Sequence, residues 1–194
     1  AMGYAIVNNI KKTTETVEAF VNDLGVMPPK PEGAPKTSMF LQMLIQEIKL
    51  GDGFNPNGDA AVVMLDINQF GFNVPALIES GTTGKELDAK NKAAIEAGLP
   101  VVIYVPGASA ATVFSNYKIE KDGDLDVVKL RMGPMFSSQL GGYVLLSPNK
   151  AAIKAVKNAV KKTSAELAAK QLTIIKRNNI SYHVDLKLLK PIVD

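Results

Sequence analysis

The chain has 194 residues, 46% of them hydrophobic and 21% charged, a composition typical of a globular domain that buries its own core. It contains no cysteine and one histidine, His183, which excludes disulfide frameworks, thiolate nucleophiles, cysteine-based metal sites and multi-histidine metal sites. No apolar run approaches the roughly 18 residues that a membrane-spanning helix needs, so we expect neither a membrane span nor a disordered chain.

Both ends of the sequence suggest a piece of a longer chain. Ala1, Met2 and Gly3 have the character of a remnant left by a removed expression tag, so we expect one domain over residues 4–194. The last strand-like run leads almost directly to Asp194, without the polar tail that usually closes a domain. We therefore expect the natural chain to continue past residue 194.

Strand and helix patterns alternate in the first half of the chain. Val17, Phe20 and Leu24 recur at helical spacing behind two threonines that can cap a helix. Four prolines within residues 26–37 predict an extended surface connection, because proline fixes φ and lacks a backbone donor. The expected elements here are a strand at 4–10, a helix from residue 13 or 14 to Gly25, a helix at 38–50, a strand at 60–67 and a helix at 85–97.

The second half opens with a β-branched run and closes with an alternating strand. Asp122-Gly123 suits a type I′ turn and predicts a hairpin. In the last strand Ile180 and Tyr182 fall on one face, and Ser181 and His183 on the other, which we expect to be solvated. The expected elements here are a strand at 100–105, a helix at 109–116, a hairpin at 117–132, a strand at 142–147, a helix from 148 with a second segment capped by Ser164, and a strand at 180–188.

The order of elements from residue 100 is strand, helix, two strands, helix, strand. This order is typical of a split βαβ arrangement, in which an antiparallel sheet carries helices mainly on one face. We therefore predict an α+β fold. The alternative is an α/β unit, in which the helix at 85–97 makes a parallel crossover within residues 60–105.

Two kinds of ligand motif begin in this sequence but lack residues that their chemistry requires. Residues 80–86 resemble the end of a phosphate-binding loop, but Glu79 replaces its first glycine and Glu86 its magnesium-binding hydroxyl. Two carboxylate-rich stretches, at 52–59 and 122–126, suggest calcium but lack the later glycine and glutamate of a calcium loop. We predict neither a cofactor nor a metal site.

His183 and Asp185 share one face of the last strand, and Ser181 or Ser147 could supply a nucleophile for a hydrolase. No G-x-S-x-G nucleophile elbow occurs, so we predict no catalytic residue and lean away from an enzyme. Folding could still bring scattered carboxylates together. Those carboxylates are Asp52, Asp59, Asp66, Asp122, Asp124 and Asp126.

Charge is distributed unevenly along the chain. Residues 1–97 carry 8 basic and 12 acidic side chains, whereas residues 98–194 carry 14 basic and 7 acidic ones. Part of the basic excess falls at helical spacing on one face of an amphipathic helix that begins near residue 148. The lysines of this face, a candidate surface for a polyanion, an anionic lipid or an acidic partner, are Lys150, Lys154, Lys157 and Lys161. Because only two arginines and no tryptophan occur, specific nucleic-acid recognition is not expected.

Residues 141–152, with the sequence GGYVLLSPNKAA, are followed by a helix and the strand SYHVDL at 181–186. This combination resembles uncharacterised exported proteins of planctomycete-type bacteria over about half of the chain. The resemblance implies an extracytoplasmic location in the periplasm or cell envelope and leaves room for a duplicated domain. It transfers no functional residue.

Three functions follow as expectations. The first is a non-enzymatic binding or structural module that contacts another protein, or a second domain of its own chain, through the sheet or the basic helix. The second is a binder of polyanions or anionic lipid that uses the four lysines. The third is a carrier of an apolar ligand, suggested by the methionine-containing helix at 38–50, and it requires a cavity beneath that helix.

Overall fold

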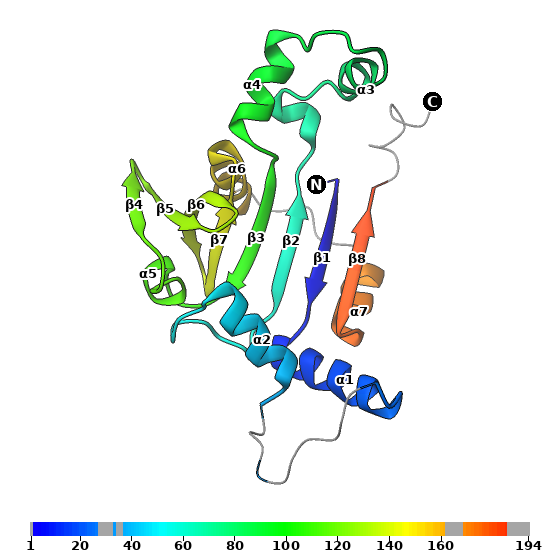
Figure 1. Ribbon diagram of the computed structural model, residues 1–194, viewed down its shortest axis with the longest axis vertical. Coiled ribbons are helices and arrows are strands. Elements are labelled where there is room, and N and C mark those ends of the chain that lie inside the picture. The colour runs from blue at the N-terminus through cyan, green and yellow to red at the C-terminus, as the bar shows by residue number, and fades with distance from the viewer. Residues whose placement is uncertain (1, 27–32, 34–36, 162–168, 186–194) are drawn as a thin grey trace.

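A computed structural model describes residues 2–26, 33, 37–161 and 169–185 of the chain (Figure 1). The strands are β1 (Gly3–Val7), β2 (Ala60–Met64), β3 (Val101–Pro106), β4 (Ile119–Asp122), β5 (Leu125–Leu130), β6 (Gly133–Leu140), β7 (Tyr143–Ser147) and β8 (Ile180–Val184). The helices are α1 (Ile10–Asp23), α2 (Met39–Ile48), η1 (Ile67–Phe70), α3 (Val74–Thr83), α4 (Ala89–Ala97), α5 (Ala110–Val113), α6 (Lys150–Lys161) and α7 (Ala169–Arg177).

The described strands form one antiparallel sheet of eight strands in the order β4-β5-β6-β7-β3-β2-β1-β8, which confirms the predicted α+β class. The alternative with a parallel crossover is wrong, because β2 and β3 pair antiparallel with Val63 opposite Val102. The chain between these strands passes through η1, α3 and α4 beyond one end of the sheet and returns on the same side (Figure 1).

The strands β4 to β7 form a meander, in which residues 123–124, 131–132 and 141–142 are the turns. Gly123 and Gly141 have left-handed φ values of 62° and 57°, which glycine adopts without steric cost. The strand β6 was not expected from the sequence. With it, the C-terminal part differs from a split βαβ unit and is a meander placed beside β3.

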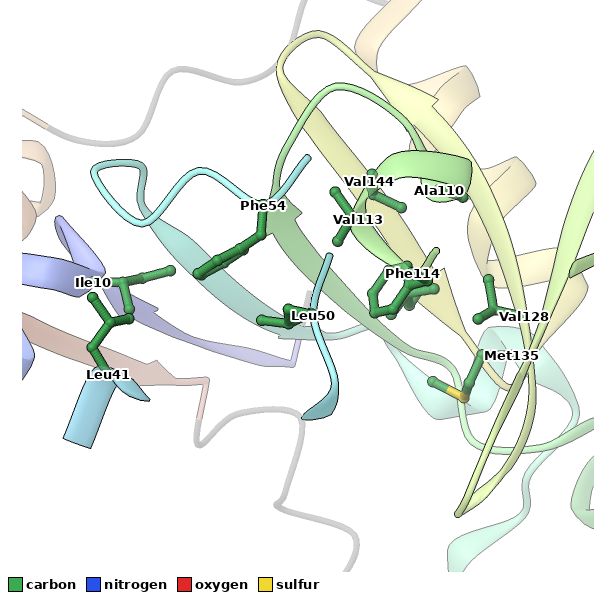
Figure 2. Packing of buried hydrophobic residues seen from close by; sticks show 11 residues of the cluster. Ile10, Leu41, Leu50, Phe54, Ala110, Val113, Phe114, Val128, Met135 and Val144 are labelled. Carbon is green, nitrogen blue, oxygen red and sulfur yellow. The ribbon is translucent and has the colours of Figure 1, made fainter. Parts of the chain in front are cut away.

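Buried side chains form two clusters on opposite faces of the sheet. On one face Ile153 and Val156 of α6 pack on Val102 and Leu145. On the other face α2, α5 and the start of α1 cover the strands (Figure 2). The helices therefore divide between the two faces of the sheet, whereas the sequence suggested helices mainly on one face. The cause is that successive residues of the central strands are apolar, so both faces of the sheet need cover.

The helix α1 differs most from its expected packing. It begins at Ile10, three or four residues before the expected start, because the Asn9 side chain caps it by accepting a hydrogen bond from the Lys12 N–H at 3.0 Å. Its buried residues include Glu18, whereas Phe20, on the face expected to be buried, is 62% exposed. The expected apolar face is thus largely open, since α1 packs sideways against α2 and not flat on the sheet.

The start of the chain takes part in the fold. Met2 is buried, its N–H donates to the Met64 carbonyl at 2.8 Å, and Gly3 begins β1. Most of the proline-rich connection, the expected cap at Ser164 and the end of the last expected strand lie outside the described residues. No helix in the described ranges is long and apolar enough to cross a membrane.

Candidate functional site

The strand β8 lies at one edge of the sheet, so the backbone N–H and C=O groups on its outer side face no other strand of the described chain. The Asp185 N–H donates to the Met2 carbonyl, and the Asn8 N–H donates to the Asn179 carbonyl. In an antiparallel pair such bonds alternate along the strand, so residues 179, 181, 183 and 185 turn their backbone groups toward β1. Residues 180, 182 and 184 turn theirs outward, and no strand of the described chain pairs with them.

The outward-bonding residues of β8 also carry its apolar side chains, and these side chains are exposed. Tyr182 is 82% exposed, and Ile180 and Val184 are each exposed by half or more. Val62 of β2 is exposed on the same face, since Ala5 of β1 is paired with both Val62 and Tyr182. We call Ile180, Tyr182 and Val184 the β8 edge patch.

The polar face of β8 is the covered one, so the expectation that it is solvated was wrong. Ser181 is buried, and its hydroxyl has no hydrogen-bond partner among the described residues. The His183 ring stacks on the Tyr4 ring with centroids 5.4 Å apart. The reversal arises because α7 packs against β8 on the far side of the sheet from α2 (Figure 1).

The opposite edge of the sheet, β4, is protected by charge. Glu120 lies between Lys118 at 2.8 Å and Lys129 at 3.1 Å, and Lys121 pairs with Asp126 at 2.5 Å. The hydrogen bond from Lys118 is the main cause that lowers the pKa of Glu120. Charged, short edge strands resist pairing with other chains, whereas the β8 edge patch has no such protection.

An apolar cavity of about 230 Å³ lies beneath α2, where the apolar-ligand hypothesis requires one. Leu44 and Ile48 of α2 form its roof, Leu50 and Phe54 one wall, and the sheet its floor. The sheet residues that line the floor are Ala60, Ile103, Tyr104, Val105, Pro106, Leu130, Met135 and Leu146. Figure 2 shows Leu50 and Phe54 between Ile10 and Phe114, two further lining residues.

The four lysines of the basic helix have different surroundings. The Lys150 ammonium pairs with the Asp122 carboxylate at 2.7 Å and lies 5.9 Å from the centre of the Phe136 ring. Lys154 is exposed and Lys157 half-buried, while the side chain of Lys161 lies outside what the structure describes. Binding of polyanions by this helix stays a prediction, with Lys150 already engaged by a carboxylate.

The weaker motifs do not converge on a ligand. Residues 80–83 form the end of α3, and Gly84 caps it in the left-handed conformation, so the phosphate-loop-like segment lies at a negative helix end. Asp122 and Asp126 are each paired with a lysine. Nowhere in the described ranges do three acidic or histidine side chains come close enough to hold a metal ion.

The hydrolase residues are also dispersed. Ser147 is on β7 and His183 on β8, with β3, β2 and β1 between them. At about 4.8 Å per strand the two residues are roughly 19 Å apart across the sheet. The Ser147 hydroxyl instead accepts a hydrogen bond from the Asn149 N–H at 3.0 Å, just before α6.

Two further pKa shifts have structural causes. Burial raises the pKa of Tyr104, because the phenolate is poorly solvated there. The pKa of Asp88 is lowered, chiefly by the hydrogen bond from the Asn91 backbone N–H. Asp88 caps the start of α4, so its lowered pKa has a structural cause, and the Tyr104 ring packs edge-on against the Tyr143 ring with centroids 6.1 Å apart.

No family model, curated protein or solved structure matches this chain. Sequence reasoning identified the helix above the cavity and the residues of the β8 edge patch. It missed that the patch is open, because only the position of α7 decides which face of β8 is covered.

Proposed function

We propose that the domain is a non-enzymatic protein-contact module, and that β8 makes the contact by pairing with β8 of a second copy. One observation carries this proposal: the sheet ends in a charged, ion-paired edge at β4 and in an uncharged, apolar edge at β8. An exposed apolar edge strand is the arrangement from which strand pairing between chains proceeds.

A second copy fits this edge for reasons of symmetry. Every described pairing in the sheet is antiparallel, and two β8 strands related by a twofold axis also pair antiparallel. With Tyr182 opposite its counterpart, residues 180 and 184 face each other, and all three outward-bonding residues gain partners. Both β8 edge patches then lie on one face of a continuous sheet.

Charge favours the same occupant. Ile180, Tyr182 and Val184 include no acidic or basic side chain, and the His183 side chain lies on the opposite face, stacked on Tyr4. Two β8 strands can therefore approach without like-charge repulsion. Since aromatic and β-branched cross-strand pairs each contribute only about 0.2–1 kcal/mol, a single strand pair predicts a weak dimer whose population depends on the protein concentration.

Proline substitutions test the pairing directly. Tyr182→Pro removes an outward N–H and spares the ladder to β1, so the fold should persist while the dimer is lost. Lys121→Pro is the matched control, because Lys121 likewise turns its N–H outward, at the β4 edge. Analytical ultracentrifugation over a wide concentration range should show dimers for the native chain and for Lys121→Pro, and monomers for Tyr182→Pro.

Two results would overturn the proposal. One is a native chain that stays monomeric at about millimolar concentration. The other is a Tyr182→Pro variant that is folded by circular dichroism and still dimerises as the native chain does. His183→Pro removes an N–H that bonds to β1, so its loss of thermal stability confirms that the two N–H directions are assigned correctly.

A further inference from the structure

The helix α2 bridges the apolar cavity and is held mainly at its two ends. At its start the Met39 N–H donates to a Glu18 carboxylate oxygen at 3.1 Å. At its end the Tyr117 hydroxyl donates to the Ile48 carbonyl at 2.9 Å, and the Asn116 amide donates to the Lys49 carbonyl at 3.1 Å. Between these anchors α2 packs on α1 and, through Leu41, against the buried core, while Leu44 and Ile48 line the cavity.

The space beneath this bridge is larger than ordinary packing leaves. Protein interiors contain few voids that exceed a water molecule, and those lined by hydrocarbon stay dry. The cavity of about 230 Å³ is lined by aliphatic and aromatic residues, without a charged or amide side chain. Such a space has no polar partner to hold water, so an apolar group is the occupant that its chemistry accepts.

From these features we infer that the cavity is a binding site for an unbranched aliphatic chain, such as that of a medium-chain alcohol or carboxylic acid. An engineered cavity of about 150 Å³ accepts benzene, which has six carbons. Scaling by volume, the cavity beneath α2 accepts about nine carbons. The polar end of the ligand then remains at the mouth, in contact with water.

The methionines at the mouth and floor of the cavity favour a flexible ligand. Met132 lines the cavity and is 82% exposed, and Met135 forms part of the floor. Methionine side chains are unbranched and adapt to irregular or variable shapes. The site should therefore tolerate chains of different length up to the limit that its volume sets.

Chain-length dependence is the first test. The full chain, labelled with ¹³C at its methionine methyl groups, is titrated with hexanol, octanol and decanol and with the corresponding carboxylates. We expect the Met132 and Met135 signals to shift, while the signals of Met2 and Met64, which do not line the cavity, stay in place. The Kd should fall about fourfold for each added methylene up to about nine carbons.

A pair of neighbouring substitutions on α2 gives the second test. Leu44→Trp places an indole in the cavity and should weaken decanol binding at least tenfold. Met43→Trp is the matched control, because Met43 is exposed on the same helix and does not line the cavity, so its variant should bind decanol as the native chain does. Since the chain has no other tryptophan, a blue-shifted emission of Leu44→Trp reports that the cavity holds the ring.

Binding by either headgroup series supports the inference, and the two series show whether the carboxylate adds affinity. Shifts that do not depend on chain length, or a folded Leu44→Trp variant that binds decanol as tightly as Met43→Trp, would overturn it. Leu44→Phe, a smaller change, serves if Leu44→Trp does not fold. These outcomes are independent of the dimer, because the cavity and the β8 edge patch share no residue.

Discussion

The segment that carries Leu50 and Phe54 into the cavity wall depends on the close approach of Gly53 to α5. A Cβ added to Gly53 would lie 2.1 Å from the Thr112 Oγ1, 2.4 Å from its Cβ and 2.7 Å from its carbonyl carbon. A change of side-chain rotamer relieves only the first of these contacts. We therefore predict that Gly53→Ala displaces the segment from α5.

The expected cost of Gly53→Ala follows from what the displacement breaks. Overpacking of this kind costs about 1–3 kcal/mol. The hydrogen bonds from the Gly51 N–H to the Val113 carbonyl, at 2.8 Å, and from the Gly53 N–H to the Thr112 carbonyl, at 3.3 Å, are weakened as well. Each such bond contributes about 1 kcal/mol, so we expect a total loss of about 3 kcal/mol and a fall in Tm of roughly 6–12 °C.

Urea and thermal unfolding, followed by circular dichroism, measure this change. Gly81→Ala is the control, because Gly81 lies inside α3 with no atom within 4 Å of the added Cβ. Helix propensity predicts that the control gains about 0.5–1 kcal/mol. Gly53 does not have a left-handed φ, so steric overlap alone is the cause of the predicted loss. A Gly53→Ala variant as stable as the native chain would refute it.

Three further substitutions test other contacts. The buried Asn91 amide donates to the Asp88 carboxylate at 3.0 Å and accepts from the Asn73 N–H at 2.9 Å. Asn91→Ala removes both hydrogen bonds and should lower the free energy of unfolding, measured in urea, by about 2–3 kcal/mol. The pKa of Asp88 is lowered in the folded chain, so the ionised carboxylate stabilises the fold above the ordinary carboxyl range, and this stabilisation is lost as the pH falls through the folded pKa. Between pH 6 and pH 3 the free energy of unfolding of Asp88→Asn should therefore fall less than that of the native chain. Lys150→Ala should cost about 1 kcal/mol, since its pair with Asp122 is only partly buried, and a loss of several kcal/mol would contradict that interpretation.

Elements with strong local patterns were predictable from the sequence. The apolar run in β3 and the Asp-Gly turn before β5 identified those elements to within a few residues. The strand β6 was missed because Pro134, Ser137 and Ser138 interrupt the pattern of a strand. In the fold Ser137 is buried, although its hydroxyl lacks a partner among the described residues. The strands on either side of β6 bury it, and a polar residue gives no sign of this in the sequence.

The candidate site depended more on distant parts of the chain. The apolar character of residues 38–50 raised the hypothesis of an apolar ligand, although Met39, Met43 and Ile48 of this helix are exposed. It could not show that α2 is held at its ends by Glu18 and Tyr117, which lie 21 and 69 residues away from their partners. The alternation in β8 was found correctly, but which face is open is decided by where α7 packs.

The pairing of β8 with β1 has a consequence for the order in which the chain folds. The meander from β4 to β7 closes through the short turns 123–124, 131–132 and 141–142, whereas β8 and β1 join residues as distant as Gly3 and Val184. Closing a long loop costs more chain entropy and slows contact formation. The meander should therefore form early and β8 should dock last, so the amides bonded between β1 and β8 should exchange with solvent hydrogen faster than those between β5 and β6.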